Sequence, residues 1–434
     1  MRRFQLRHSF WVALLLCLSL LVGGCTTAPP SPGEAEPSSS NHTLTLWHAL
    51  SEDEAEVLQG LADEWASRQE GEVQVQLEAS SDEDSLHQKL TASIQTEMMP
   101  SLAFVRPSDI AAYVDADALV ALDSLMEEGE NPLTDEERED FYTSFWESVR
   151  YARAGNAQYA WPVHRHQTLL FINRTRMQEL NQRLPPATWE ALVAACAAHR
   201  ARGGPNCFAA HPTGSVAVLW IWSHDGRMTN EAGTQPTFQN EAGQEVMHWL
   251  GELRALDGVY QAPTYEGQRD AFVDGTTLFT FDSTAAIPEY EALINSEWDL
   301  AVMPPPSTDE VPVTVATGGN AAIFRSDPET QALAWDFLRF WTDTQANYQW
   351  ADALGAYPVR QSALEQLEAQ WPEDSLLRQA AEWLPYARSE PMLAAWPQVS
   401  QALAQAIINT INGQAMPDEA LEEAARRAEG LLNP

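Results

Sequence analysis

The sequence predicts an α/β fold in which a largely parallel sheet is covered by helices on both faces. Alternation of apolar and polar residues predicts strands over 43–48 and 73–77, and a short apolar run predicts a third strand over 102–105. Between these strands, apolar residues recur at helical spacing over 51–65 and 86–94. Strands that alternate with helices in this way build parallel sheets, because each helix carries the chain back to the edge at which the next strand starts.

The boundaries of the predicted elements come from capping residues and chain breakers. Ser51 and Glu54 have the spacing of a capping box, so the first helix is expected to begin there. Thr188, which follows two prolines, is expected to cap a second helix near 189–199. Further strands are predicted at 160–163, 168–172, 277–281 and 321–324, a helix is predicted after Ser326, Asp327 and Pro328, and the chain from about 361 onward is predicted to be almost wholly helical.

The first residues of the chain form an expected export signal. Three arginines precede an apolar run from Phe10 to Val22, which is too short to span a bilayer and has the length of a secretory signal. Gly23 and Gly24 directly before Cys25 resemble a bacterial lipobox, in which the cysteine is lipidated and becomes the first mature residue. We therefore expect residues 1–24 to be removed and the protein to be extracytoplasmic, held at the membrane by acyl chains on Cys25.

Composition narrows the classes of function. The chain carries 62 acidic and 25 basic residues, a formal charge of −37, so it is not expected to bind nucleic acid or to dock on anionic lipid through a basic patch. Residues 25–41 are rich in proline and serine and are expected to be a disordered tether. The remaining length predicts two or more domains. Cys196 and Cys207 lie in an expected oxidising compartment and are expected to form a structural disulfide rather than a redox pair.

Six stretches of the chain carry a resemblance to one protein family. They are 44–50 (LTLWHAL), 159–174 with YAWPV and LFINR, 184–190 (LPPATWE), 332–338 (ALAWDFL), 355–360 (GAYPVR) and 407–421 with PDEAL. In this order they resemble the extracellular solute-binding proteins of family 1, which are lipoprotein receptors of ABC importers for sugars and glycerol-phosphate compounds. The resemblance spans about residues 42–434 and makes an enzymatic activity unexpected.

The resemblance implies a periplasmic-binding-protein-like fold of type II with two discontinuous lobes and a hinge. Lobe one is expected at 42–163 plus 313–345, and lobe two at 164–312 plus 346–434. A sugar, oligosaccharide or polyol is expected to bind between the lobes, with no cofactor, and ABC permease subunits are the expected partners of a monomeric receptor. Hinge closure suits such a receptor, because it couples ligand contacts to an equilibrium between open and closed forms.

Aromatic residues are the first candidates for ligand contacts, because a tryptophan face suits the C–H groups of a sugar ring. Trp47 and His48 end a predicted parallel strand, where open α/β sheets place their ligands. Trp220 and Trp222 lie in a segment that borders the cleft in the family. A buried helix is the alternative for that segment.

Three consecutive ionisable residues, His164, Arg165 and His166, occupy the expected crossing between the lobes. They are expected either to face a water-filled cleft, with Arg165 able to attract a phosphate or carboxylate, or to pair with carboxylates. The two histidines lack a third ligand for a metal site. By analogy with the family, Asp282, Ser283, Gly319, Asn320 and Tyr357 also face the cleft.

Two other classes of function remain open at the level of sequence. An exported carbohydrate-active hydrolase would need a catalytic motif, and no nucleophile elbow, His-Glu-x-x-His helix or Ser-x-x-Lys motif is present, although carboxylate pairs are available. A sensor lipoprotein of the same fold is the other alternative.

Glycerophosphate-specific relatives carry small hydroxyl residues where this chain has Arg165 and His166. This difference favours an oligosaccharide or polyol over glycerol 3-phosphate as the solute.

Overall fold

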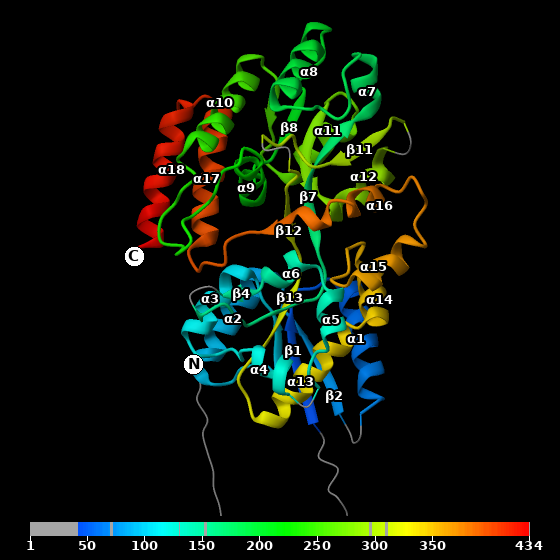
Figure 1. The fold of residues 1–434 in the computed structure, drawn as a ribbon. Coiled ribbons are helices and arrows are strands. Elements are labelled where there is room, and N and C mark those ends of the chain that lie inside the picture. Colours follow the sequence, from blue (N-terminus) through cyan, green and yellow to red (C-terminus); the bar gives the residue numbers. More distant parts are fainter. Residues whose placement is uncertain are drawn as a thin grey trace, which may run out of the picture. The chain divides into compact units, whose positions relative to one another are not determined.

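The computed structural model describes residues 42–69, 73–129, 131–151, 154–294, 297–308 and 311–433. The expected signal peptide, Cys25 and the expected tether lie outside the described residues. The described part contains two mixed sheets, each flanked by helices, and Figure 1 shows them around β1 and around β7. This arrangement confirms the predicted α/β fold.

The first sheet has five strands in the order β2-β1-β3-β13-β6. β1 runs parallel to both of its neighbours, with Leu46 level with Leu77 on one side and Leu102 on the other, as the strand-helix alternation predicts. β13 and β6 extend the sheet as antiparallel strands. The strands are β1 (His42–His48), β2 (Val73–Ala79), β3 (Leu102–Phe104), β6 (Trp161–Pro162) and β13 (Asn320–Ile323), and β4 (Arg150–Tyr151) and β5 (Ala157–Gln158) form a separate antiparallel pair.

Helices cover this sheet on two faces. One hydrophobic cluster joins it to α1, α13 and α14, and another joins it to α2 and α3. The helices of this part are α1 (Glu52–Ala66), α2 (Glu83–Thr96), α3 (Pro107–Asp115), α4 (Asp123–Glu128), α5 (Asp135–Asp140), α6 (Thr143–Glu147), α13 (Pro328–Trp341), α14 (Thr344–Leu354) and α15 (Gln361–Glu368). The capping box of Ser51 and Glu54 forms as predicted, and Phe337 and Trp341 of α13 are buried.

The second sheet has seven strands, with the path β14-β12-β7-β10-β8-β9 and with β11 beside β7. β7 is the central strand, and β10, β11 and β12 all pair with it in antiparallel fashion. The strands are β7 (His166–Asn173), β8 (Phe208–Ala210), β9 (Val259–Gln261), β10 (Phe279–Ser283), β11 (Leu300–Met303), β12 (Thr314–Thr317) and β14 (Ala387–Ser389).

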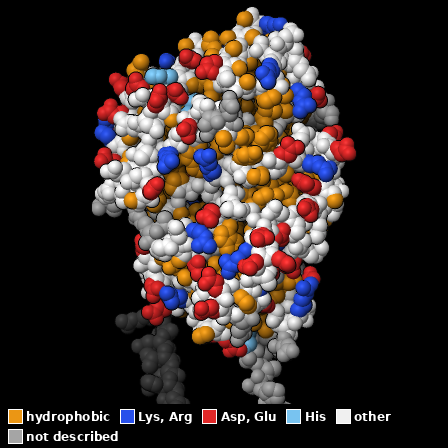
Figure 2. All heavy atoms as spheres, in the orientation of Figure 1, with side chains coloured by type: hydrophobic (Ala, Val, Ile, Leu, Met, Phe, Trp, Pro, Cys, Tyr) orange, Lys and Arg blue, Asp and Glu red, His pale blue; other side chains and the backbone are white. Residues whose placement is uncertain are grey.

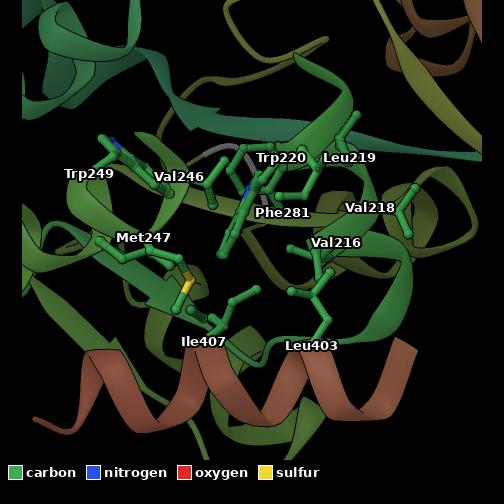
Figure 3. Close-up of a cluster of buried hydrophobic side chains, with 14 of the residues drawn as sticks. Val216, Val218, Leu219, Trp220, Val246, Met247, Trp249, Phe281, Leu403 and Ile407 are labelled. Atoms are coloured by element: carbon green, nitrogen blue, oxygen red, sulfur yellow. The ribbon is translucent and has the colours of Figure 1, made fainter. Parts of the chain in front are cut away.

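The helices around the second sheet enclose a large aromatic core. Trp220, Trp249 and Phe281 meet there, and α17 packs below α9 and α10 (Figure 3). The helices are α7 (Arg174–Glu179), α8 (Trp189–Ala201), α9 (Gly214–Ser223), α10 (Glu241–Ala255), α11 (Tyr265–Val273), η2 (Thr284–Ala286), α12 (Ile287–Ile294), α16 (Leu376–Ala381), η3 (Leu384–Tyr386), α17 (Trp396–Ile411) and α18 (Pro417–Leu432). Among the described residues, none of the helices is long and apolar enough to cross a membrane.

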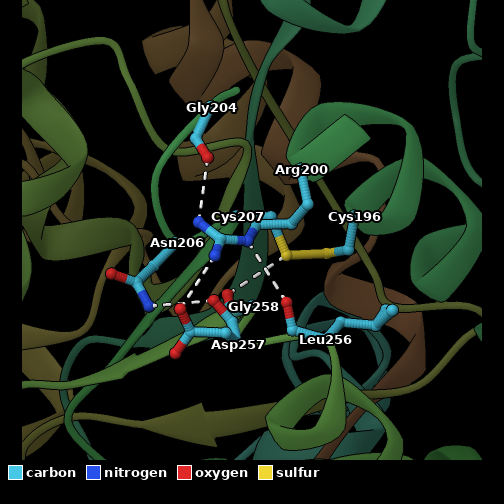
Figure 4. Close-up of a disulfide and its surroundings, with 8 residues drawn as sticks. All are labelled: Cys196, Arg200, Gly204, Asn206, Cys207, Leu256, Asp257 and Gly258. Atoms are coloured by element: carbon cyan, nitrogen blue, oxygen red, sulfur yellow. Dashed lines mark hydrogen bonds and ion pairs between the residues drawn. A yellow bond between two sulfur atoms is a disulfide. The ribbon is translucent and has the colours of Figure 1, made fainter. Parts of the chain in front are cut away.

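A disulfide joins Cys196 of α8 to Cys207 at the start of β8 (Figure 4). The intervening loop is also held by Arg200, which donates hydrogen bonds to the carbonyl oxygen of Gly204 and to the carboxylate of Asp257. Closing a loop of this length stabilises a fold by about 2–3 kcal/mol, because the unfolded chain loses conformational freedom. The disulfide and the Arg200 bonds therefore fix the same corner of the second sheet.

The structure differs from the sequence expectation around the crossings and near the C-terminus. Residues 314–317, expected in lobe one, form β12 of the second sheet, because β12 pairs with β7 before the chain leaves that sheet. α14, expected in lobe two, packs against α1 beside the first sheet. β14 was not expected within the helical C-terminal region, and its three residues carry no period that a sequence pattern could reveal.

The chain passes from the first sheet to the second between β6 and β7, returns between β12 and β13, and passes to the second sheet once more between β13 and β14. The first two of these passages, the two crossings, touch at Gly318, where φ is 137°. A Cβ atom at this position would lie 2.5 Å from the carbonyl oxygen of His164 and 2.9 Å from the Cα atom of Arg165. Only glycine fits there, because both the backbone conformation and the close approach exclude a side chain.

We expect Gly318→Ala to lower the free energy of unfolding by about 1–3 kcal/mol, since a non-glycine residue is strained at this φ and meets backbone atoms. Urea unfolding followed by circular dichroism measures the loss. Gly60→Ala is the matched control, because Gly60 lies within α1 with no atom within 4 Å of the added Cβ. That change should stabilise the protein slightly, and equal effects of the two variants would contradict the tight crossing.

Candidate functional site

Two adjoining cavities lie where elements of the first sheet meet elements of the second. Their volumes are about 270 Å³ and about 350 Å³. The first cavity is lined mainly by α1, α2, α3 and the crossings, whereas the second also takes residues from α9, β14 and α17. Both are lined by Glu83, Arg106, Pro107, Gly318 and Asn320. Together they offer the space that small-molecule sites usually have, so we treat them as one cleft.

The floor of the cleft is made by the two crossings. The backbone N–H of Val163 donates to the carbonyl oxygen of Gly319 over 3.1 Å, which ties one crossing to the other. Gly319 also packs against the His164 ring so closely that a Cβ atom would lie 2.6 Å from it. The backbone of this floor is therefore exposed to a ligand at a point where the two sheets are joined.

Arg165 is buried in this floor, with 2% of its surface exposed. Its guanidinium donates to the carbonyl oxygens of His164 and Gly319, to Ser148 Oγ and to Asn320 Oδ1, over 2.8 to 3.0 Å. None of these acceptors is charged, and no ion pair of Arg165 is found in the described part of the chain. Burial lowers the pKa of Arg165, yet an arginine keeps its proton at neutral pH. The floor of the cleft thus holds a positive charge that no carboxylate neutralises.

His164 and His166 flank this arginine as neutral side chains. The backbone N–H of Gly319 points at Nε2 of His164 and the indole N–H of Trp350 points at Nδ1, each over 3.1 Å. A neutral imidazole can accept at only one nitrogen, and a protonated one at neither. Burial lowers the pKa of His164 well below its usual value, and burial together with Arg165 lowers the pKa of His166 to about 4 against the opposing effect of Glu54.

A polar cluster lines the first cavity on the side of α2 and α3. Arg106 donates to Asp109 over 2.8 Å and to Asp84 over 2.7 Å. His87 Nδ1 lies 2.8 Å from the hydroxyl of Tyr113 and 3.3 Å from Asp109. Burial and the charge of Asp109 raise the pKa of Tyr113, so its hydroxyl remains protonated. This wall therefore presents fixed donors and acceptors rather than a mobile charged surface.

The opposite wall, in the second cavity, carries an aromatic ring and a carboxylate. Trp396 is nearly buried and lines the cavity at the start of α17. Its indole N–H donates to Glu390 Oε2, and the hydroxyl of Ser215 donates to Glu390 Oε1. The carboxylate is held in one orientation by two neutral donors. A tryptophan beside a fixed acceptor is a usual arrangement for binding a hydroxylated ring.

The structure brings four of the sequence-predicted ligand residues together in the cleft. They are His164, Arg165, Gly319 and Asn320. The other eight line neither cavity: Trp47, His48, His166, Trp220, Trp222, Asp282, Ser283 and Tyr357. Trp47 lies beneath the ammonium group of Lys89, which is 3.7 Å from the ring centroid, and His48 is buried beside it.

Several of these outlying residues are part of the core. Trp220 is 0% exposed and lies inside the aromatic core of the second sheet, so the buried-helix alternative describes its position (Figure 3). Tyr357 is fully buried, and its backbone pairs with that of Arg165. Trp222 packs at the edge of the same core as Trp220. Asp282 accepts from the hydroxyl of Tyr290 over 2.8 Å and lines neither cavity.

Sequence reasoning missed most of the two side walls. Arg106, Asp109 and Tyr113 follow the third strand, at the edge where parallel sheets bind ligands, and that position was an available signal. Glu390 and Trp396 gave no such signal, because they reach the cleft only through the placement of β14 and α17. Among the described residues, no group of three metal-ligating side chains is found.

A model of the family described as bacterial extracellular solute-binding protein matches residues 61–379. The chain belongs to this family. Its members bind solutes rather than convert them, so the protein falls in the class of binding proteins and not of enzymes. The family description also agrees with the export predicted from the first residues of the chain.

A named relative of this solute-binding protein is only distantly similar to it. The sn-glycerol-3-phosphate-binding periplasmic protein UgpB of Yersinia enterocolitica is 22% identical over 296 residues, which are 63% of this chain and 66% of that protein. The match thus spans just under two thirds of that relative's length.

Solved structures show the same fold at low sequence identity. The cyclic alpha-maltosyl-1,6-maltose binding protein of Arthrobacter globiformis has a TM-score of 0.76 at 20% identity, over 90% of this chain and 99% of that chain. The sugar-binding protein MalE of Xanthomonas citri has a TM-score of 0.77 at 15% identity, over 90% of this chain and 97% of that chain. At such identities the likeness shows the fold alone.

The buried carboxyl of Asp282 makes the free energy of unfolding depend on pH. Burial raises the pKa of its carboxyl from 3.8 to about 6, against hydrogen bonds that lower it. The folded state then binds the proton more tightly than the unfolded state, so this group stabilises the fold below pH 4 and the contribution is lost as the pH rises through 6. We expect Asp282→Asn to gain up to about 3 kcal/mol relative to the original protein between pH 4 and pH 7.5.

Urea unfolding at the two pH values measures this gain. Asp352→Asn is the control, because it removes an exposed carboxylate on α14 in place of a buried one. If Asp282→Asn shifts the stability equally at both pH values, then the carboxyl is not held in the buried position described.

Proposed function

We propose that this protein is a membrane-anchored receptor that captures a sugar, oligosaccharide or polyol between its two sheets and delivers it to an ABC importer. The sheets with their helices would act as the two lobes, and the crossings at 163–166 and 317–320 as the hinge. The family membership supports the receptor class. The observation that carries the proposal is the cleft, which is walled by elements of both sheets and floored by both crossings.

The chemistry of the cleft supports a hydroxyl-rich solute. Sugar hydroxyls need fixed hydrogen-bonding partners, and Asn320 on the floor and Tyr113 on the first wall provide such groups. Trp396, which lines the second cavity with 4% of its surface exposed, adds apolar ring atoms to the second wall. We propose that residues of both walls contact the solute, so that binding favours the closed arrangement. The structural likeness to two proteins named for sugar binding is consistent with this class.

Delivery to permease subunits requires that the receptor stay near the membrane. We propose that Cys25 is lipidated after removal of residues 1–24 and that residues 26–41 act as the tether. Two or more acyl chains hold a protein stably at a bilayer surface, whereas one is marginal. The acidic surface makes a second, electrostatic attachment to anionic lipid unnecessary and unfavourable: Figure 2 shows acidic side chains over the visible face, with basic ones scattered among them.

The proposal predicts a ligand-dependent rise in melting temperature. For a soluble form that starts at residue 41, a ligand present at one hundred times its Kd should raise the midpoint by about 3 °C, because it stabilises only the folded state. A thermal-shift screen against sugars, polyols and glycerophosphodiesters measures the rise, and isothermal titration calorimetry of each hit checks it. Turnover of a hit by the protein, seen by chromatography of the recovered ligand, would contradict the receptor function.

A lipid anchor on Cys25 predicts that the full chain and its Cys25→Ala variant partition differently between detergent and water. The full chain expressed in a bacterium should enter the detergent phase in a phase-separation assay, and Cys25→Ala should leave the protein in the aqueous phase or retain the uncleaved signal. Cys17→Ala is the control, because Cys17 lies inside the apolar run and should not affect lipidation. Equal detergent partitioning of the mature Cys25→Ala protein would rule out the anchor.

A further inference from the structure

The two guanidinium groups of the cleft have little capacity left for an anionic ligand. An arginine has five N–H donors, and the four terminal ones of Arg165 already point at His164, Gly319, Ser148 and Asn320. A phosphate is clamped by two parallel N–H groups on one edge of the guanidinium. Arg165 therefore contributes positive charge to the cleft but offers no such edge.

Arg106 is committed to carboxylates. Its Nε and Nη2 donate to Asp109, and its Nη1 donates to Asp84. The lysine of this chain, Lys89, lines neither cavity and pairs with Glu78 over 2.8 Å. His164 is neutral, and both guanidinium groups of the cleft lining already donate their hydrogen bonds to protein acceptors.

Glu390, unlike the two arginines, retains hydrogen-bonding capacity for a ligand. Its two oxygens each accept one hydrogen bond from a neutral donor, Ser215 or Trp396, and no ion pair of Glu390 is found in the described part of the chain. A carboxylate oxygen can accept a second hydrogen bond, so both oxygens retain capacity toward the cavity. Glu54, Glu83 and Asp109 also line the cleft, so carboxylates outnumber guanidinium groups there.

We propose that Glu390 determines specificity: it accepts hydrogen bonds from hydroxyls of an uncharged sugar or polyol and excludes the phosphorylated form of the same compound. This inference rests on the proposed function and names its substrate class. A phosphate in the cleft would meet the Glu390 carboxylate as a like charge and would find no free guanidinium edge. An uncharged ring meets neither penalty, and Trp396 and Ser215 hold the acceptor in place for it.

The test compares matched pairs of probes by isothermal titration calorimetry: maltose with maltose 1-phosphate, trehalose with trehalose 6-phosphate, and glycerol with sn-glycerol 3-phosphate. We expect at least one uncharged probe to bind, and to bind about tenfold tighter or more than its phosphate. Glu390→Gln keeps the size of the side chain and one oxygen acceptor but removes the charge. This substitution should weaken binding of the uncharged probe about fivefold to tenfold. It should also reduce the ratio of affinities for the uncharged probe and its phosphate by about the same factor.

Two control variants separate charge from orientation. Glu147→Gln removes a nearby negative charge outside the cleft, since Glu147 is exposed on α6 and lines neither cavity, and it should leave the preference unchanged. Ser215→Ala removes one donor to Glu390 without removing the charge. It should weaken the uncharged probe yet retain the exclusion of the phosphate, which also covers the case in which Glu390→Gln does not fold.

The outcomes distinguish this inference from the proposed function. Binding of a phosphorylated probe as tightly as its uncharged partner would overturn the inference and leave a solute receptor. So would an unchanged preference in folded Glu390→Gln. Binding of none of the probes, together with no hit among sugars and polyols in the thermal-shift screen, would overturn the proposed function, and the inference would fall with it.

Discussion

The site depends on the contact between the two crossings. At Gly318 the backbones of the crossings approach so closely that a Cβ atom would meet the carbonyl oxygen of His164, and the guanidinium of Arg165 fills the space beside them with bonds to both. A buried charge without a counterion is costly unless several dipoles solvate it. Here two carbonyl oxygens, a hydroxyl and a side-chain amide do so. Moving either crossing alone would break part of that set, so the floor of the cleft is fixed while the walls around it are free to differ.

This constraint decides what the floor can offer to a solute. The four terminal N–H groups of Arg165 all donate to protein atoms. Arg165 therefore positions the floor and contributes positive electrostatic potential to the cleft, but it does not bind an anion through two parallel N–H groups. Hydrogen bonds to a ligand must then come from groups whose capacity is not used, such as Asn320, Glu390 and the polar residues after β3. These groups lie on both sides of the floor, so a solute that reaches all of them joins the sheets. In such a receptor the contacts that bind the solute also favour closure, so the free energy of binding and the free energy of closure are coupled.

The sequence predicted those parts of the molecule in which local pattern and tertiary packing agree. The capping box at Ser51, the cap at Thr188 and the alternation in β1 each leave a local mark, and the structure has all three elements. Trp220 shows the limit of this reasoning: a tryptophan next to an apolar helix face has the same local pattern whether it lines a cleft or fills a core. Only its packing against Phe208, Trp249 and Phe281 in the folded protein buries it. β14 and Glu390 were missed for a related reason. Their position follows from pairing with β12, which is about seventy residues earlier in the chain.

The order in which the walls occur along the chain has a consequence for stability. The cleft is lined by residues within 49–54, 83–113, 148–165, 316–320 and 389–400 and by Ser215, which are brought together only in the folded protein. The unfolded chain therefore has no comparable site, and a ligand stabilises the fold by the full mass-action term. The wall that carries Trp396 and Glu390 comes last along the chain, and both residues depend on the second sheet for their position. A receptor built in this way can change its specificity at α9, β14 and α17 while the floor of the cleft, fixed by Arg165 and Gly318, stays the same.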